Sequence, residues 1–197
     1  MIYSALIKLQ KGYGFLMRFR KGINLTIYLT LRCNLKCDYC ANKYYTSKTA
    51  TSELTIEEWK RKIETFPYQI KQVQLTGGEP TLYPEFKELV EYLLSRKIFV
   101  IVYTNLTNDI AFEDNIRLRF LSTYHRWMNP SKWVERYMSL NFRKSSVELE
   151  TNIFPFTNKQ NVCSKEDVDI QPNRFIYSPN GKLYTHAREM LTSLNNP

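Results

Sequence analysis

The chain has 197 residues, of which 43% are hydrophobic and 24% are charged. This length and balance suit one globular domain with a single core, and they exclude disordered, collagen-like and low-complexity classes. No apolar run reaches the roughly 18 residues that a membrane helix needs. Lys8 and Lys11 interrupt the early apolar stretch, so we expect no secretory signal and a cytoplasmic protein without a membrane span.

Positive charge is concentrated at the start of the chain. The net charge is +9, and the residues from Met1 to Cys37 include seven lysines and arginines but no acidic residue. A stretch of this kind is typical of a solvated basic face. It also suits attraction of an acidic protein, a nucleic acid or an anionic lipid surface.

Hydrophobic periodicity predicts strands and helices in alternation, which is typical of an α/β fold. The five or six predicted β/α units are too few for a closed eight-fold barrel, which takes about 250 residues. We therefore expect a partial, open β/α barrel of about five or six parallel strands with flanking helices. Strands are predicted at 24–30, 72–76, 98–103, 117–123 and 147–153, and helices at 2–17, 55–66, 84–96, 109–116 and 131–140.

The end of the chain departs from this alternation. Asn180-Gly181 lies between two strand-like runs, 175–178 and 182–186, and this pair of residues is a strong signal for a β-hairpin. We accordingly expect three parts. They are an N-terminal basic segment at 1–23, a core at 24–155 and a C-terminal extension with the hairpin at 156–197.

Three of the four cysteines lie within eight residues, at a C-x3-C-x2-C spacing. Cys33, Cys37 and Cys40 follow the first predicted strand, so one loop can bring three sulfurs to one metal centre. A structural zinc site wants four protein ligands, and no fourth ligand lies close in the sequence. Three cysteines without a partner pair fit better with a [4Fe–4S] cluster in which one iron has no protein ligand. The distant candidates for a fourth zinc ligand are Cys163, His125 and His186.

Two further motifs follow the second and third predicted strands. Gly77-Gly78-Glu79-Pro80 ends the second strand, and Thr104-Asn105-Leu106 ends the third. Parallel α/β folds bind ligands at the carboxyl ends of their strands, so we expect the cysteines and both motifs in the same mouth. The glycines would let the backbone approach a ligand closely, and the proline would stiffen the exit from the turn.

These residues together resemble the radical S-adenosylmethionine (SAM) superfamily. The run LTLRCNLKCDYC resembles its C-x3-C-x-aromatic-C signature, with Tyr39 as the aromatic residue. The GGEP run resembles the superfamily motif that contacts the SAM amino group. The third motif is a weaker match, because Leu106 stands where many members have glycine. With their flanking elements the matches cover residues 24–125.

The resemblance implies an enzyme in which Cys33, Cys37 and Cys40 hold a [4Fe–4S] cluster whose fourth iron takes the amino and carboxylate groups of SAM. Reduced flavodoxin or ferredoxin would supply one electron, and SAM would be cleaved to methionine and a 5′-deoxyadenosyl radical. That radical would abstract hydrogen from a peptide or protein, a nucleic acid or a small molecule. The resemblance implies SAM contacts for Tyr39, Gly77, Gly78, Glu79, Pro80, Asn105 and Ser122.

Two other functions stay open at this point. One is a glycyl-radical activating enzyme, which can be this small and needs one cluster. The other is a zinc- or iron–sulfur-bearing module that binds nucleic acid without turnover. Many peptide-modifying relatives carry further clusters in a C-terminal extension. Here His186 stands where the hairpin would supply a cysteine, and Cys163 is expected as a buried residue, so no auxiliary cluster is expected.

Overall fold

A computed structural model gives the fold, and it describes residues 22–37, 40, 52–113, 115–122, 129–139, 175–185, 189–190 and 193. The predicted helix at 2–17 and the predicted strand at 147–153 lie outside the described residues, as does most of the basic segment. The described elements in chain order are β1 (Ile23–Thr30), α2 (Ile56–Glu64), β2 (Ile70–Gly77), the 3₁₀ helix η2 (Pro80–Leu82), α3 (Phe86–Ser95), β3 (Phe99–Thr104), β4 (Leu118–Ser122), α4 (Pro130–Ser139), β5 (Phe175–Tyr177) and β6 (Leu183–Tyr184).

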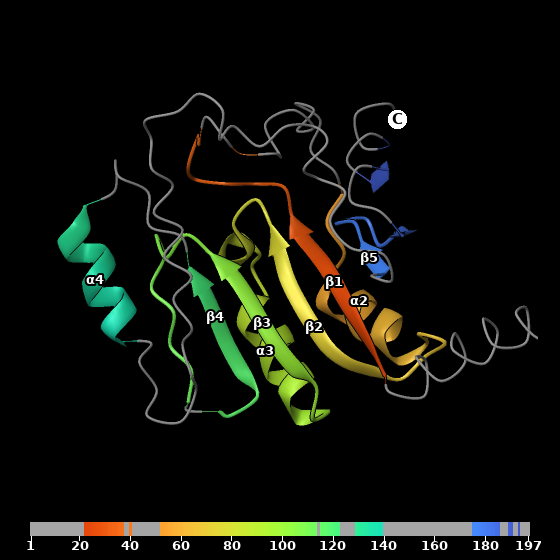
Figure 1. Cartoon of the computed structure of the whole chain (residues 1–197). Helices are drawn as coiled ribbons and strands as arrows, with labels where there is room; N and C mark the ends of the chain where they lie inside the picture. Colours follow the sequence, from red (N-terminus) through yellow and green to blue (C-terminus); the bar gives the residue numbers. More distant parts are fainter. Residues whose placement is uncertain are drawn as a thin grey trace, which may run out of the picture.

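A six-stranded sheet in the order β4-β3-β2-β1-β5-β6 forms the centre of the molecule. The first five strands run parallel to one another, and β6 pairs antiparallel with β5. Figure 1 shows α2 and α3 behind one face of the sheet, with α4 to the side beyond β4. Within the described part of the chain, no helix is long and apolar enough to span a bilayer. The predicted α/β fold, with a partial barrel and a C-terminal hairpin, is confirmed.

The hydrophobic core lies between the sheet and the two helices behind it. Leu25, Ile27 and Leu29 alternate along β1 and have no exposed surface, because alternate residues of a strand face the same side. Trp59 of α2 and Leu89 of α3 pack into the same core and are also fully buried. This packing fixes the sheet edge on which the site is built.

The start of α2 follows its prediction. The backbone N–H of Glu58 donates to Thr55 Oγ1 at 3.4 Å, and the backbone N–H of Thr55 donates to Glu58 Oε2 at 2.8 Å. This reciprocal capping box satisfies two backbone donors at the start of the helix.

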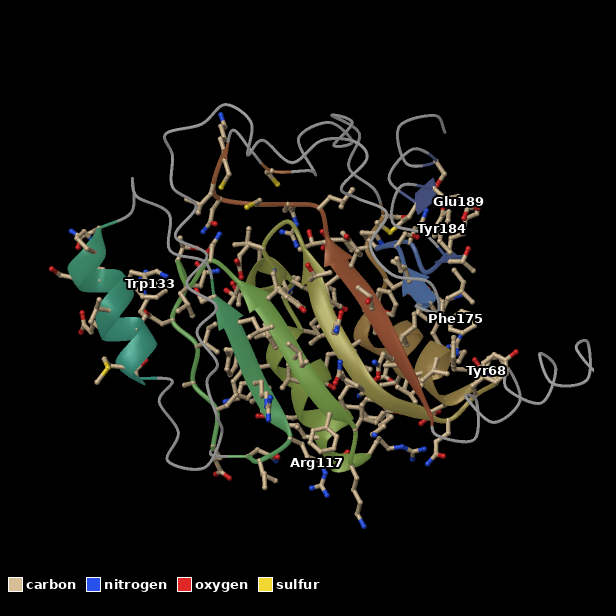
Figure 2. The ribbon with its side chains drawn as sticks, in the orientation of Figure 1. Tyr68, Arg117, Trp133, Phe175, Tyr184 and Glu189 are labelled. Carbon is tan, nitrogen blue, oxygen red and sulfur yellow. The ribbon has the colours of Figure 1, made fainter. Side chains whose placement is uncertain are left out.

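The C-terminal hairpin is part of the central sheet. β5 pairs in parallel with β1, with Ile27 opposite Tyr177. The Tyr177 ring packs edge-on against Trp59, with centroids 5.9 Å apart, and the Leu54 N–H donates to Pro179 O at 3.0 Å. Figure 2 shows the neighbouring rings of Tyr68 and Phe175, whose centroids are 5.7 Å apart. The hairpin therefore shares its packing with α2.

The predicted helix at 109–116 is wrong for the described part of that range. Residues 109–113 and 115 form an irregular connection between β3 and β4. Phe112 packs between Phe86 of α3 and Phe120 of β4, with ring centroids 6.0 and 5.9 Å away. The packing of this ring between two elements outweighs the weak helical pattern, because tertiary contacts readily override helix propensity.

Replacement of Tyr177 tests whether the hairpin unfolds together with the core. Tyr177→Ala should lower the free energy of unfolding by about 3–5 kcal/mol, as is typical for the loss of a buried aromatic ring. Urea denaturation followed by tryptophan fluorescence measures the change. Ile116→Ala is the control, because Ile116 is 67% exposed, and it should cost less than about 1 kcal/mol. An unchanged unfolding midpoint for Tyr177→Ala would place the hairpin outside the cooperative unit.

Candidate active site

The carboxyl ends of β1 to β4 lie along one edge of the sheet, at the top of Figure 1. The last residues of these strands are Thr30, Gly77, Thr104 and Ser122. The strand register pairs Thr30 with Gly77 and Thr104 with Ser122, and all four residues are buried. This edge is therefore lined by small and hydroxylated residues that are shielded from solvent, at the place where parallel α/β folds bind ligands.

The turn after β2 is joined directly to the end of β1. The Gly78 N–H donates to Thr30 O at 2.8 Å, and the Glu79 N–H donates to Arg32 O at 2.8 Å. A Cβ on Gly77 would lie 2.1 Å from Thr30 O, and one on Gly78 would lie 2.2 Å from Arg32 O. The physical reason for the two glycines thus differs from the expected one: the backbone that approaches them is the chain's own, where it enters the cysteine loop.

Glu79 ties the end of β2 to the end of β3 through its side chain. Its Oε1 accepts from the Thr81 N–H at 3.1 Å, the Thr81 hydroxyl at 2.6 Å and the Thr104 hydroxyl at 2.8 Å. Its Oε2 accepts from the Asn105 N–H at 2.8 Å. Glu79 is 1% exposed, and Pro80 follows it as the first residue of η2. The carboxylate is a buried cross-link between two of the predicted motifs.

Asn105 connects the end of β3 to the cysteine loop. Its Nδ2 donates to Asn34 Oδ1 at 3.0 Å and lies 3.9 Å from Cys33 Sγ. Its Oδ1 accepts from the Thr107 N–H at 2.9 Å and from the Thr107 hydroxyl at 2.5 Å. The loop bearing the first cysteine, the GGEP turn and the third motif therefore form one hydrogen-bonded unit.

Leu106 has a backbone conformation that favours glycine over residues with a side chain. Its φ is 55°, in the left-handed region that disfavours a side chain. The Leu106 N–H donates to Thr104 Oγ1 at 3.1 Å, and its carbonyl accepts from Arg136 Nη1 of α4 at 3.3 Å. The side chain is 1% exposed. Burial of the leucine thus offsets the strain that glycine would avoid.

The three predicted cluster ligands are thiols on one loop, and none of the three is in a disulfide. Cys33 is exposed and Cys37 and Cys40 are partly exposed, and the Cys40 N–H donates to Cys37 O at 3.1 Å to close a turn. Among the residues that the structure describes, no three Cys, His, Asp or Glu side chains lie close enough together to share a metal ion. The thiols share a loop without sharing a centre, so ligation would draw the loop together. Tyr39 lies outside the described residues.

The environment of Cys33 raises the pKa of its thiol overall, through effects of opposite sign. Partial burial raises the pKa of the Cys33 thiol, and the nearby negative groups of Glu79 and Cys40 raise it further. The backbone N–H groups of Leu35 and Asn34 lower the pKa of the same thiol, and the Leu35 N–H lies 3.5 Å from Cys33 Sγ. Metal ligation removes the thiol proton, so these donors point to the sulfur that a metal would bind as thiolate.

An ion pair at the entrance of the cysteine loop was not anticipated from the sequence. Arg32 Nε and Nη2 donate to the two carboxylate oxygens of Glu53 at 2.9 and 2.7 Å, and Nη2 also donates to Leu82 O at 2.9 Å. The Thr30 hydroxyl donates to Glu53 as well. The guanidinium therefore links the cysteine loop, the segment before α2 and the end of η2. Its sequence signal is weak, because the two partners are 21 residues apart and belong to no motif.

Ser122 lies at the same sheet edge as Thr104. It ends β4 beside Thr104, is 2% exposed, and its Oγ has no hydrogen-bond partner among the described residues. A buried hydroxyl without a partner is an available hydrogen-bonding group for a bound molecule. The histidines at 125 and 186 and the cysteine at 163 lie outside the described residues.

The sequence match agrees with this geometry. A family model of the radical SAM superfamily matches residues 27–138, which is more than half of the chain and includes all three motifs. The chain therefore belongs to the radical SAM superfamily and is an enzyme, as predicted. The superfamily implies SAM and an iron–sulfur cluster as its cofactors.

Two curated relatives illustrate the similarity. The chain is 36% identical over 104 residues to a PqqA peptide cyclase of Bradyrhizobium diazoefficiens, covering 51% of this chain and 26% of the relative. It is 34% identical over 102 residues to the mycofactocin maturase MftC of Mycobacterium tuberculosis, covering 48% of this chain and 26% of the relative. The chain thus spans about a quarter of the length of these relatives.

Among solved structures, BtrN in complex with SAM (AdoMet) and 2-DOIA has a similar fold. The TM-score is 0.59 at 15% sequence identity, and the match covers 85% of this chain and 74% of that one. At this identity the likeness concerns the fold, and it agrees with the partial barrel described above.

Gly78→Ala tests the joint between β1 and the GGEP turn. The added Cβ would meet a backbone carbonyl, which cannot swing away as a side chain can. We expect the free energy of unfolding to fall by about 3 kcal/mol or more, measured by urea denaturation. In the control Gly181→Ala the new Cβ meets the flexible ends of Leu54 and Lys62 and φ is 73°, so the cost should be only about 1–2 kcal/mol, from the left-handed conformation. Equal stability of Gly78→Ala and wild type would contradict the close backbone contact between residue 78 and the end of β1.

At Leu106 we expect the glycine variant to be more stable than the alanine variant, the reverse of the usual order. Leu106→Ala and Leu106→Gly both lose a buried side chain and should cost about 2–5 kcal/mol. Glycine relieves the left-handed strain, so Leu106→Gly should be more stable than Leu106→Ala by about 1 kcal/mol. At Leu89, inside α3, glycine should instead be less stable than alanine by about 1 kcal/mol. If alanine were more stable than glycine at both positions, the proposed backbone strain at Leu106 would be refuted.

Proposed function

We propose that this chain is the catalytic core of a radical SAM enzyme that cleaves SAM reductively, with a [4Fe–4S] cluster on Cys33, Cys37 and Cys40. The observation that supports it most is the direct bonding of the three motifs. The GGEP turn donates two backbone hydrogen bonds to residues 30 and 32, just before the first cysteine. Asn105, from the third motif, bonds to the GGEP carboxylate and to the cysteine loop.

The residues at this edge fit the proposed cofactors. Three thiols within eight residues are the donor set of a cluster that leaves one iron without a protein ligand, and the unpaired Ser122 hydroxyl is available at the same edge. When bound, the cluster supplies the electron that divides SAM into methionine and a 5′-deoxyadenosyl radical, and this chemistry belongs to the cofactor.

The protein residues themselves hold the site together and orient SAM. Glu79 uses both carboxylate oxygens to fix the ends of β2 and β3, and its buried negative charge would attract the cationic groups of SAM. The backbone of Gly77, Gly78 and Pro80 is the proposed neighbour of the SAM amino group. Further SAM contacts are proposed for Asn105, Ser122 and, outside the described residues, Tyr39.

For the substrate we propose a peptide, held on the face of the sheet turned away from α2 and α3. Alternation along the strands puts Thr26, Gln74 and Arg119 on this face: Thr26 pairs with Gln74, and Ile101 separates Gln74 from Arg119 in the same row. The likeness to a PqqA peptide cyclase supports a peptide. Other relatives are GTP 3′,8-cyclases, so GTP is the informative probe: GTP consumption coupled to SAM cleavage would contradict the proposal.

For the electron donor we propose a reduced flavodoxin or ferredoxin, attracted by the basic residues that precede the first acidic one at position 38. Within the described residues, Lys36 of the cysteine loop is exposed and adds to this positive charge, whereas the charge of Arg32 is paired with Glu53. A glycyl-radical activating role has no specific contact in its favour. A nucleic-acid-binding module without turnover is set aside, because the chain belongs to a superfamily of enzymes.

Anaerobic reconstitution tests the proposed reaction. The wild-type chain should take up about four irons and four sulfides, and with SAM and dithionite it should form 5′-deoxyadenosine, measured by liquid chromatography and mass spectrometry. Cys33→Ala, Cys37→Ala and Cys40→Ala should each lose the cluster and the product. Cys163→Ala is the matched control and should keep both. Stoichiometric zinc without 5′-deoxyadenosine would overturn the proposal.

A further inference from the structure

The side chain of Asn105 has a fixed orientation beside the first cysteine. The Thr107 backbone N–H can act only as a donor, and it lies 2.9 Å from Asn105 Oδ1. This contact identifies the oxygen end of the amide. The Nδ2 end must then face the cysteine loop, where it lies 3.0 Å from Asn34 Oδ1 and 3.9 Å from Cys33 Sγ.

The residue that bears this amide is anchored at the sheet edge through its backbone, in addition to its side-chain bond to Asn34 of the loop. The Asn105 N–H donates to Glu79 Oε2 at 2.8 Å, so the residue is anchored to the buried carboxylate that joins β2 and β3. The residue is 8% exposed, and the left-handed turn at Leu106 follows it at once. A donor built in this way keeps its position when the cysteine loop closes on a cluster.

We propose that Asn105 is a positioning residue for the first cluster ligand, donating from Nδ2 to the Cys33 thiolate and so raising the reduction potential of the cluster. The inference rests on the proposed function. Reduction adds negative charge to a cluster and its sulfur ligands, and hydrogen bonds to those sulfurs help to set its potential. A donor at Cys33 stabilises the reduced form more than the oxidised form.

Asn34 accepts from the same amide, whose two N–H groups reach both Asn34 Oδ1 and Cys33 Sγ, and the shorter contact with Asn34 holds the amide away from the sulfur. Its Oδ1 is the nearer acceptor for Asn105 Nδ2, while its own Nδ2 donates to Thr107 Oγ1 at 2.6 Å. Removing the Asn34 side chain would leave Cys33 Sγ as the remaining acceptor for this amide among the contacts described. The two asparagines should therefore affect the cluster with opposite signs.

The experiment uses the full chain with its cluster reconstituted anaerobically, followed by a potentiometric redox titration. SAM is left out, so that any contact of Asn105 with SAM has no effect on the result. The readouts are iron per chain and the midpoint potential from the electron paramagnetic resonance signal of the reduced cluster. Asn105→Ala should keep the iron and lower the equilibrium constant for one-electron reduction of the cluster about tenfold. The midpoint potential would then be about 59 mV more negative. Asn34→Ala should move the midpoint in the positive direction.

Asn115→Ala is the matched control, because Asn115 accepts from the Arg117 N–H away from the cysteine loop, and its midpoint should equal that of wild type. Full iron and an unchanged midpoint in Asn105→Ala would overturn the inference while leaving the proposed function intact. If Asn105→Ala fails to hold iron, Asn34→Ala decides: a positive shift supports the inference, and any other result overturns it. A wild-type chain that assembles no cluster would overturn both.

Discussion

Two backbone hydrogen bonds between the end of β1 and the turn after β2 hold the candidate site together. They join the carbonyls of residues 30 and 32 to the N–H groups of residues 78 and 79, and they require a separation that only glycine permits at positions 77 and 78. The cysteine loop starts one residue beyond this joint. The contacts that fix the GGEP turn therefore also fix the backbone position just before Cys33.

The buried carboxylate of Glu79 extends this joint across the sheet. Burying a charge is costly unless donors replace the lost water, and here two hydroxyls and two backbone N–H groups do so. The result is a negative charge that is screened from solvent yet lies beside the cysteine loop. One side chain thus serves the fold, by linking β2 to β3, and the site, by setting the electrostatic character of the mouth.

The sequence was informative where chemistry or periodicity is local. The spacing of the three cysteines, the GGEP run and the alternation of strands and helices each depend on neighbouring residues, and the fold follows from them. The pairing of Arg32 with Glu53 depends on two charges brought together by the sheet, so no local pattern shows it. The helix predicted at 109–116 failed because Phe112 is needed between α3 and β4. The left-handed leucine at 106 was visible as a departure from the motif, but its compensation by burial needed the folded neighbours.

The Arg32–Glu53 pair has a consequence for how the chain can vary. Residue 32 follows the end of β1 and residue 53 precedes α2, and the bidentate contact joins the two ends of the intervening twenty residues. Doubling the length of a loop with fixed ends adds only about 0.6 kcal/mol of closure entropy. Insertions after Cys40 would therefore burden the sheet very little. The stretch next to the cysteines in sequence is a position at which evolution or protein engineering can add new elements without rebuilding the barrel.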